Sequence, residues 1–340
     1  MRQDHRHDGV EELTGAAPSQ GILLSDIPES LFRQDLLKLP GDEQRKVLNK
    51  LTKKPQLLAD VDSLRVDPGG MLYYTCTFGI HDDRNTDTSE RLEVLPVGEA
   101  GAESSAAPVP ISSPPVLHSR PGATKVLFLD FNGHVIEGTR WNTTREVESW
   151  NCLPYDTDGD ITTFNQYEMA VITQAWERVS EDYAPFDVDV TTQQPAEWNQ
   201  NTGHALITPG VDANGVDCPH KGYGGIAYVD VFDYYRYSYD YAGDCYSPAW
   251  CQDYDADSVS EVISHEFGHN QNLAHDGFEV AGITNAYYRG LENSSISWGT
   301  IMGSSYGENV TQGSRGEYYG ANNTEDDLAI LAGFLDYRPD

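Results

Sequence analysis

Residues 265–276, which read HEFGHNQNLAHD, constrain the fold and chemistry of this chain more than any other stretch. His265 and His269 are four residues apart, so on a helix both imidazoles lie on one face and can reach one metal ion. Glu266 then projects beside the ion, and His275 offers a third nitrogen if the chain leaves the helix and turns back. A metal with three protein ligands keeps its fourth position for water, which is typical of catalytic zinc. The alternative is an amphipathic helix whose histidines are merely exposed or packed in the core.

The same residues resemble the metzincin zinc peptidases, whose pattern is HExxHxxGxxH followed by a methionine turn. The form HExxHNxxxxHD is most similar to the reprolysin (adamalysin)-like branch, and residues 300–303 (TIMG) resemble the Met-turn. This resemblance implies an α+β catalytic domain of two lobes, with a twisted mixed sheet, helices and the zinc helix at the cleft. It also implies roles for five residues: zinc ligands at His265, His269 and His275, the general base at Glu266, and the turn methionine at Met302.

One position departs from the family pattern. Asn272 stands where the family usually has the glycine that ends the helix in a left-handed conformation. Asparagine is among the few other residues enriched in that conformation, so we expect a positive φ at Asn272. A more distant carboxylate, Glu279 or Glu292, is an alternative third ligand.

The sequence divides into three parts. Residues 1–97 carry two helical patterns, Ser30 to Leu39 and another after Pro40, and a strand-like run at 71–78, and we interpret this region as a propeptide. Residues 98–122 are rich in Pro, Ser and Ala and indicate a linker. Residues 123–340 are the expected zinc metallopeptidase domain.

The main domain shows an alternation of strand and helix patterns. Residues 126–131 form a buried strand pattern, and apolar residues from Met169 to Tyr183 repeat at helical spacing, behind an expected capping box of Thr163 and Gln166. Further strands are expected at 187–191, 204–208 and 225–231, and a closing helix near 328–335. By the resemblance, the strand that begins Gly225, Ile226, Ala227 edges the cleft and pairs with substrate; an ordinary sheet strand is the alternative.

The cysteines suggest a latency device. Cys76 lies alone in the first part, ahead of the linker, where its thiolate can be the fourth zinc ligand until the linker is cut. Many metzincins use such a cysteine switch, although the surrounding CTFG lacks their usual motif, and a spare buried cysteine is the alternative. The remaining cysteines, Cys152, Cys218, Cys245 and Cys251, are sufficient for two disulfides.

A second metal is suggested by the acidic loop DTDGD. Asp156, Asp158 and Asp160 place oxygens at alternate positions, like the first half of an EF-hand calcium loop. The glycine and the closing glutamate of that loop are missing at the expected places, and the alternative is a solvated acidic turn.

Composition limits the partners. The net charge of −32 over 340 residues argues against nucleic acid and anionic membranes. The sequence contains no run long enough for a membrane span, and no signal peptide is visible. The cysteines fit a secreted, extracellular protein, which we expect, and a protein that stays inside the cell is the alternative. Oligomeric state is not indicated.

These patterns predict a zinc-dependent endopeptidase, with protein or peptide substrates, that hydrolyses peptide bonds through a metal-activated water with Glu266 as general base. The alternative from another class is a non-catalytic, acidic extracellular surface or adhesion module that retains a structural metal site.

Overall fold

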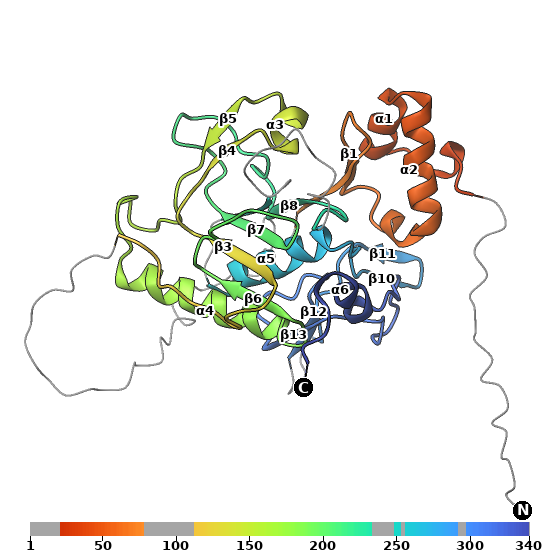
Figure 1. Ribbon diagram of the computed structural model, residues 1–340. Helices are drawn as coiled ribbons and strands as arrows, with labels where there is room; N and C mark the ends of the chain where they lie inside the picture. The colour runs from red at the N-terminus through yellow and green to blue at the C-terminus, as the bar shows by residue number, and fades with distance from the viewer. Residues whose placement is uncertain (1–20, 78–111, 233–247, 253–255, 292–296, 340) are drawn as a thin grey trace, which may run out of the picture.

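The computed structural model describes residues 21–77, 112–232, 248–252, 256–291 and 297–339 (Figure 1). The N-terminal region comprises η1 (Leu24–Asp26), α1 (Leu31–Lys38), α2 (Gly41–Lys53), η2 (Pro55–Leu58), β1 (Leu64–Val66) and β2 (Leu72–Cys76). The main domain begins with β3 (Lys125–Asp130), β4 (Val135–Glu137), α3 (Arg140–Arg145), β5 (Ser149–Asn151) and α4 (Gln166–Asp182). It continues with β6 (Val188–Thr191), β7 (Thr202–Ile207), β8 (Gly225–Tyr228), β9 (Ala249–Cys251) and α5 (Ala256–Asn270). The last part holds β10 (Phe278–Val280), β11 (Ile283–Asn285), β12 (Trp298–Thr300), β13 (Val310–Gln312) and α6 (Asp327–Leu335).

A seven-stranded mixed sheet organises the molecule, in the order β1-β2-β8-β9-β7-β3-β6. Strand β3 is parallel to β6 and β7, and β7 is parallel to β9, whereas β8 runs antiparallel to both β9 and β2. Helices α4 and α5 pack together beside this sheet (Figure 1). The predicted α+β fold, with a mixed sheet and helices, is confirmed.

The two faces of the sheet bury different side chains, because successive residues of a strand point to opposite sides. On one side, Leu127 and Leu129 of β3 pack in one cluster with Val259, Ile263 and Phe267 of α5. The opposite face is covered by an aromatic cluster built from Trp141, Trp150, Ile136, Leu206 and Trp250. Helix α5 therefore occupies one side of the sheet only.

The N-terminal region shares its core with the main domain. Phe32, Leu51, Leu57 and Tyr74 belong to the same buried cluster as the residues of α5. The strand expected at 71–78 is β2, and it lies inside the sheet between β1 and β8. The described residues at 21–77 are thus held against the main domain by sheet pairing and by apolar contact.

The end of the predicted linker also packs against the main domain. The amide of Ser119 donates to the carbonyl of Val190, and the amide of Thr192 donates to the carbonyl of Leu117. Residues 112–122 therefore lie against β6 rather than standing apart from the domain. The division of the chain into propeptide, linker and peptidase domain stays a prediction.

Among the described cysteines no disulfide is formed: Cys76, Cys152, Cys218 and Cys251 are free and buried. Cys152 and Cys218 lie within hydrogen-bonding reach of each other, and together with burial this contact raises the pKa of the Cys152 thiol. Cys245 lies outside the described residues. Within the described chain, no helix has the length and apolar character that crossing a membrane requires.

Candidate metal centre

Helix α5 positions two of the three predicted ligands. His265 and His269 are buried on its last two turns, and the helix ends at Asn270. Asn272 then adopts φ 72°, the left-handed conformation expected for the residue in the place of the family glycine. The turn is closed by the Leu273 amide, which donates to the carbonyl of Gly268 at 2.9 Å. This reversal brings His275 back toward the helix.

The three imidazoles converge with one thiol. The ligand atoms of Cys76, His265, His269 and His275 all lie within 4.8 Å of one another, and all four residues are buried. The Nε2 atoms of His269 and His275 are 3.0 Å apart, and the Sγ atom of Cys76 is 3.5 Å from each. The structure therefore brings together the predicted zinc residues and the predicted switch cysteine.

The outer nitrogens of these rings fix their orientation. The Nδ1 of His265 contacts the carbonyl of Ile301 at 2.9 Å, and the Nδ1 of His269 contacts the carbonyl of Leu273 at 2.8 Å. The Nδ1 of His275 contacts the carboxylate of Asp60 at 2.8 Å. Because these oxygens only accept, each Nδ1 donates to its oxygen, and each ring turns its Nε2 toward the centre of the cluster.

The Nε2 atoms of His269 and His275 face each other at 3.0 Å, a distance that requires a proton or a metal cation between them. Burial, followed by the neighbouring imidazoles, lowers the pKa values of His265 and His269 well below their ordinary value, so these rings are neutral ligands. Three imidazole nitrogens and one sulphur form a donor set that suits zinc. The residues present therefore fit a zinc ion.

Glu266 lies beside this cluster and is fully buried. Burial raises the pKa of its carboxyl group well above the ordinary value, opposed by the nearby Cys76 thiol. Gly225 of β8 makes room for it: a Cβ at this position would lie 2.3 Å from Glu266 Oε1. The glycine was predicted to admit a peptide, and in this structure the space beside it is filled by the glutamate.

Met302 lies under the zinc helix, as the Met-turn resemblance implies. It is buried, and its Sδ would be 2.6 Å from a Cβ added at Gly268, between the two histidines of α5. The turn around Met302 is held against the segment that carries His275, because the Asp276 amide donates to the Met302 carbonyl at 2.8 Å. Glu279, the alternative third ligand, is exposed, and Glu292 lies outside the described residues.

The N-terminal region covers the strand expected at the edge of the cleft. β2 pairs antiparallel with β8, with Cys76 opposite Gly225, Thr75 opposite Ile226 and Tyr74 opposite Ala227. In this form of the chain β2 and β1 add two strands beyond β8, and pairing of β8 with a substrate stays a prediction. The position at which a substrate backbone would pair is occupied by β2.

Three neighbours of the cluster were missed by sequence reasoning. Tyr74 packs its ring on His269 and His275 at centroid distances of 4.5 and 4.3 Å. Tyr287 packs on His275 at 4.6 Å, and Asp60 contacts its Nδ1. Asp60 is 215 residues from its partner, so no local spacing could have indicated this contact.

The predicted calcium loop is arranged differently from the expectation. Asp156 and Asp158 group with buried Glu168, whereas Asp160 accepts hydrogen bonds from Thr162 and Thr163. Glu168 accepts hydrogen bonds from the amide and hydroxyl of Thr157 and from the Asn165 amide. The structure thus groups Glu168 rather than Asp160 with Asp156 and Asp158, and calcium at this loop stays a prediction.

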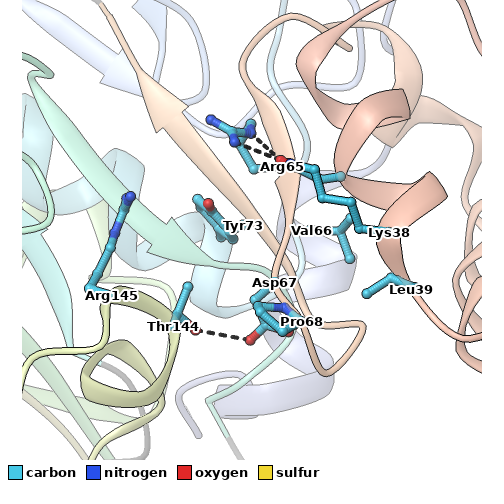
Figure 2. A pocket seen from close by; sticks show the side chains of 10 residues that line it. Lys38, Leu39, Arg65, Val66, Asp67, Pro68, Tyr73, Thr144 and Arg145 are labelled. Carbon is cyan, nitrogen blue, oxygen red and sulfur yellow. Dashed lines mark hydrogen bonds and ion pairs between the residues drawn. The ribbon is translucent and has the colours of Figure 1, made fainter.

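A pocket of about 280 Å³ lies at the boundary of the N-terminal region and α3, away from the histidines (Figure 2). Its lining includes Lys38 and Arg65 from the first part and Arg145 from α3. Beside it, the buried carboxylate of Asp67 accepts hydrogen bonds from Arg140 and Thr144. The pocket thus marks a contact between the two parts of the chain.

Comparison with known proteins identifies the central segment. A search of curated proteins finds no match. Residues 161–276 match the family described as metallo-peptidase family M12B, reprolysin-like. The matched segment contains α4, β6 to β9 and α5, and it ends one residue after the third converging histidine. The segment from α4 to the third histidine is therefore similar to the reprolysin-like metallopeptidases of family M12B.

Proposed function

We propose that the full chain is the latent form of a secreted zinc endopeptidase in which Glu266 is the general base. The observation that carries the proposal is the convergence of three buried imidazoles on one point, with Cys76 in the fourth place and Glu266 beside it. His265, His269 and His275 would hold the zinc ion.

When bound, zinc lowers the pKa of a water molecule to about 7 and polarises the peptide carbonyl. Glu266 would take up a proton from the attacking water at a carboxylate oxygen and later deliver it to the leaving amine. Strand β8 would position the peptide, since the side that now pairs with β2 can pair with an extended backbone once β2 has left.

Latency follows from two contacts of the N-terminal region. The Cys76 thiol occupies the place that water needs, and β2 occupies the place that a substrate strand needs. Cutting the chain between β2 and β3 would free β2 to leave, after which both places become available. Secretion is proposed from the sequence and is tested by assaying the culture medium for the protein.

The first test compares the wild type with Glu266→Gln after the linker has been cut. We expect Glu266→Gln to lower casein hydrolysis by at least about 10²-fold, because the amide cannot accept the proton, while zinc content and thermal stability stay at wild-type levels. Hydrolysis unaffected by the substitution would contradict the assigned role. A non-catalytic adhesion module would show no hydrolysis in either protein.

The second test uses Cys76→Ala in the full, uncut chain. Removing the thiol opens the fourth ligand position, so we expect hydrolysis of a short peptide without processing, at a rate below that of cut wild type because β2 still pairs with β8. Cys218→Ala is the control, since it removes a buried thiol outside the histidine cluster. Complete latency of Cys76→Ala would contradict the switch.

A further inference from the structure

We propose that Asp130, His134 and His204 bind a second zinc ion with a structural role. The three residues come from the end of β3, the loop after it and the middle of β7. Their ligand atoms all lie within 4.8 Å of one another, the same limit that encloses the four residues of the first cluster. None of the three belongs to that first cluster.

The distances converge on one oxygen. Asp130 Oδ2 lies 2.9 Å from His134 Nδ1 and 3.0 Å from His204 Nε2. The rings of His134 and His204 have their centroids 5.0 Å apart, and the three ring pairs of the first cluster are 4.7, 4.8 and 5.1 Å apart. The second group thus repeats the spacing of imidazoles that face one metal ion.

Asp130 is held as a carboxylate in the interior. Its side chain is 2% exposed, and although burial raises the pKa of this group, hydrogen bonds and charge interactions with His134 and His204 bring the pKa below its ordinary value. A carboxylate kept ionised beside two imidazoles in a low-dielectric interior is a favourable place for a cation. A divalent ion neutralises the carboxylate, and two imidazoles with one carboxylate are a donor set that zinc accepts.

Aromatic side chains fix the rings in place. His204 is fully buried, with the ring of Phe128 stacked on it at 5.5 Å and Trp198 at 4.9 Å. Trp198 also contacts His134 at 5.8 Å. His134 itself is 14% exposed, which leaves a path for the ion and for a water molecule as a further ligand.

The group lies on the side of the sheet away from α5. His204 shares a face of β7 with Leu206, which belongs to the aromatic cluster, whereas Ala205 and Ile207 pack in the core with α5. An ion at this place would lie on the other face of the sheet from the helix that carries His265 and His269. Its effect is to tie β3 and β7 to the loop that leads into β4.

The test counts zinc per chain by elemental analysis of the dialysed, full-length protein. We expect about two zinc ions in the wild type and about one in a His265→Ala/His269→Ala variant, which lacks the first site. This count is independent of hydrolysis, so the second site and the proposed function can fail separately. A His265→Ala/His269→Ala variant that holds no zinc would overturn the proposal.

Two variants then locate the second ion. Asp130→Asn keeps an oxygen that accepts hydrogen bonds from the imidazoles but removes the negative charge. His134→Gln changes a partly exposed loop residue, so we expect the fold of this variant to be retained. Each should lower the count from two to one, and His134→Gln should lower the melting temperature. If His134→Gln keeps two zinc ions, the group is only a hydrogen-bonded network and the proposal is wrong.

His118→Gln provides the matched control. His118 Nδ1 contacts Asp189 Oδ2 at 2.7 Å, yet among the described residues this pair is not part of a metal-binding group. The control should therefore keep two zinc ions. A loss of zinc in this variant equal to that in His134→Gln would also overturn the assignment.

Discussion

At the scale of single residues, the site depends on a few positions whose conformation or size is dictated by a neighbour. Asn272 takes the left-handed conformation that turns His275 toward the helix. Gly225 is small because Glu266 fills the space where its side chain would be. The sequence indicated the conformation of Asn272. It did not indicate why residue 225 is a glycine, because the contact between Gly225 and Glu266 joins a strand and a helix far apart in the chain.

Substitutions of Asn272 test the backbone requirement. At φ 72° glycine pays no steric penalty, whereas alanine does, so Asn272→Ala should lower the free energy of unfolding by about 1–2 kcal/mol and Asn272→Gly by less. Zinc affinity should follow the same order, since the turn places His275. Thermal melting and zinc titration measure both quantities, and equal effects of Ala and Gly would argue against a conformational role.

At the scale of elements, the sequence predicted whether a segment is a helix or a strand better than it predicted where that helix or strand begins and ends. The apolar repeat at Met169 to Tyr183 correctly predicted α4, with Ile172 and Val179 fully buried. The expected capping box of Thr163 and Gln166 is wrong: the helix is capped by Asn165 with Glu168 at the third position. Thr163 with Gln166 and Asn165 with Glu168 both have the spacing of a capping box. The helix begins after Asn165 because Glu168 accepts hydrogen bonds from Thr157 and Asn165, and the contact with Thr157 cannot be read from the local pattern.

Asp182 links α4 to the zinc helix and makes that contact dependent on pH. Ser264 of α5 and Thr311 of β13 donate to its carboxylate at 2.6 and 2.8 Å, and burial raises its pKa to about 6 from an ordinary 3.8. The folded protein therefore holds this proton more tightly than the unfolded chain. The resulting stability is present at low pH and declines as the pH rises from about 4 to about 6.

Replacing Asp182 with Asn should remove this dependence. Between about pH 4 and pH 7 the wild type should lose about 1–3 kcal/mol more than Asp182→Asn, corresponding to a shift of roughly two pKa units. Melting temperatures at both pH values give the comparison. If the wild type is instead stabilised relative to the variant at the higher pH, the raised pKa is contradicted.

At the scale of the whole molecule, the sequence predicted the catalytic cluster but not what surrounds it. The spacing of His265, His269 and His275 is local, so the motif revealed it. The positions of Asp60, Tyr74 and the Asp130–His134–His204 group depend on which strands pair, and a single sequence does not state this. The resemblance supplied the fold class, and the integration of β1 and β2 into the sheet was not foreseen.

A buried ion pair holds the two parts of the chain together. Asp67, whose side chain is fully buried, accepts from Arg140 and from the Tyr228 hydroxyl across the boundary. Removing one partner leaves a buried charge, so Asp67→Ala should destabilise the chain by about 3–5 kcal/mol and increase hydrolysis by the uncut protein. Lys38→Ala, which removes an exposed ion pair with Asp35, should change stability by less than about 1 kcal/mol. Equal effects would exclude Asp67 as a latch.

The central claim, that Cys76 and three histidines share one zinc ion in the uncut chain, is tested most directly by X-ray absorption at the zinc edge. The measurement uses full-length protein with His134→Gln, so that one ion is observed. We predict nitrogen scatterers at about 2.0–2.1 Å and one sulphur at about 2.3 Å, with the sulphur lost in the added Cys76→Ala variant. A spectrum without sulphur in the protein that retains Cys76 would contradict the claim.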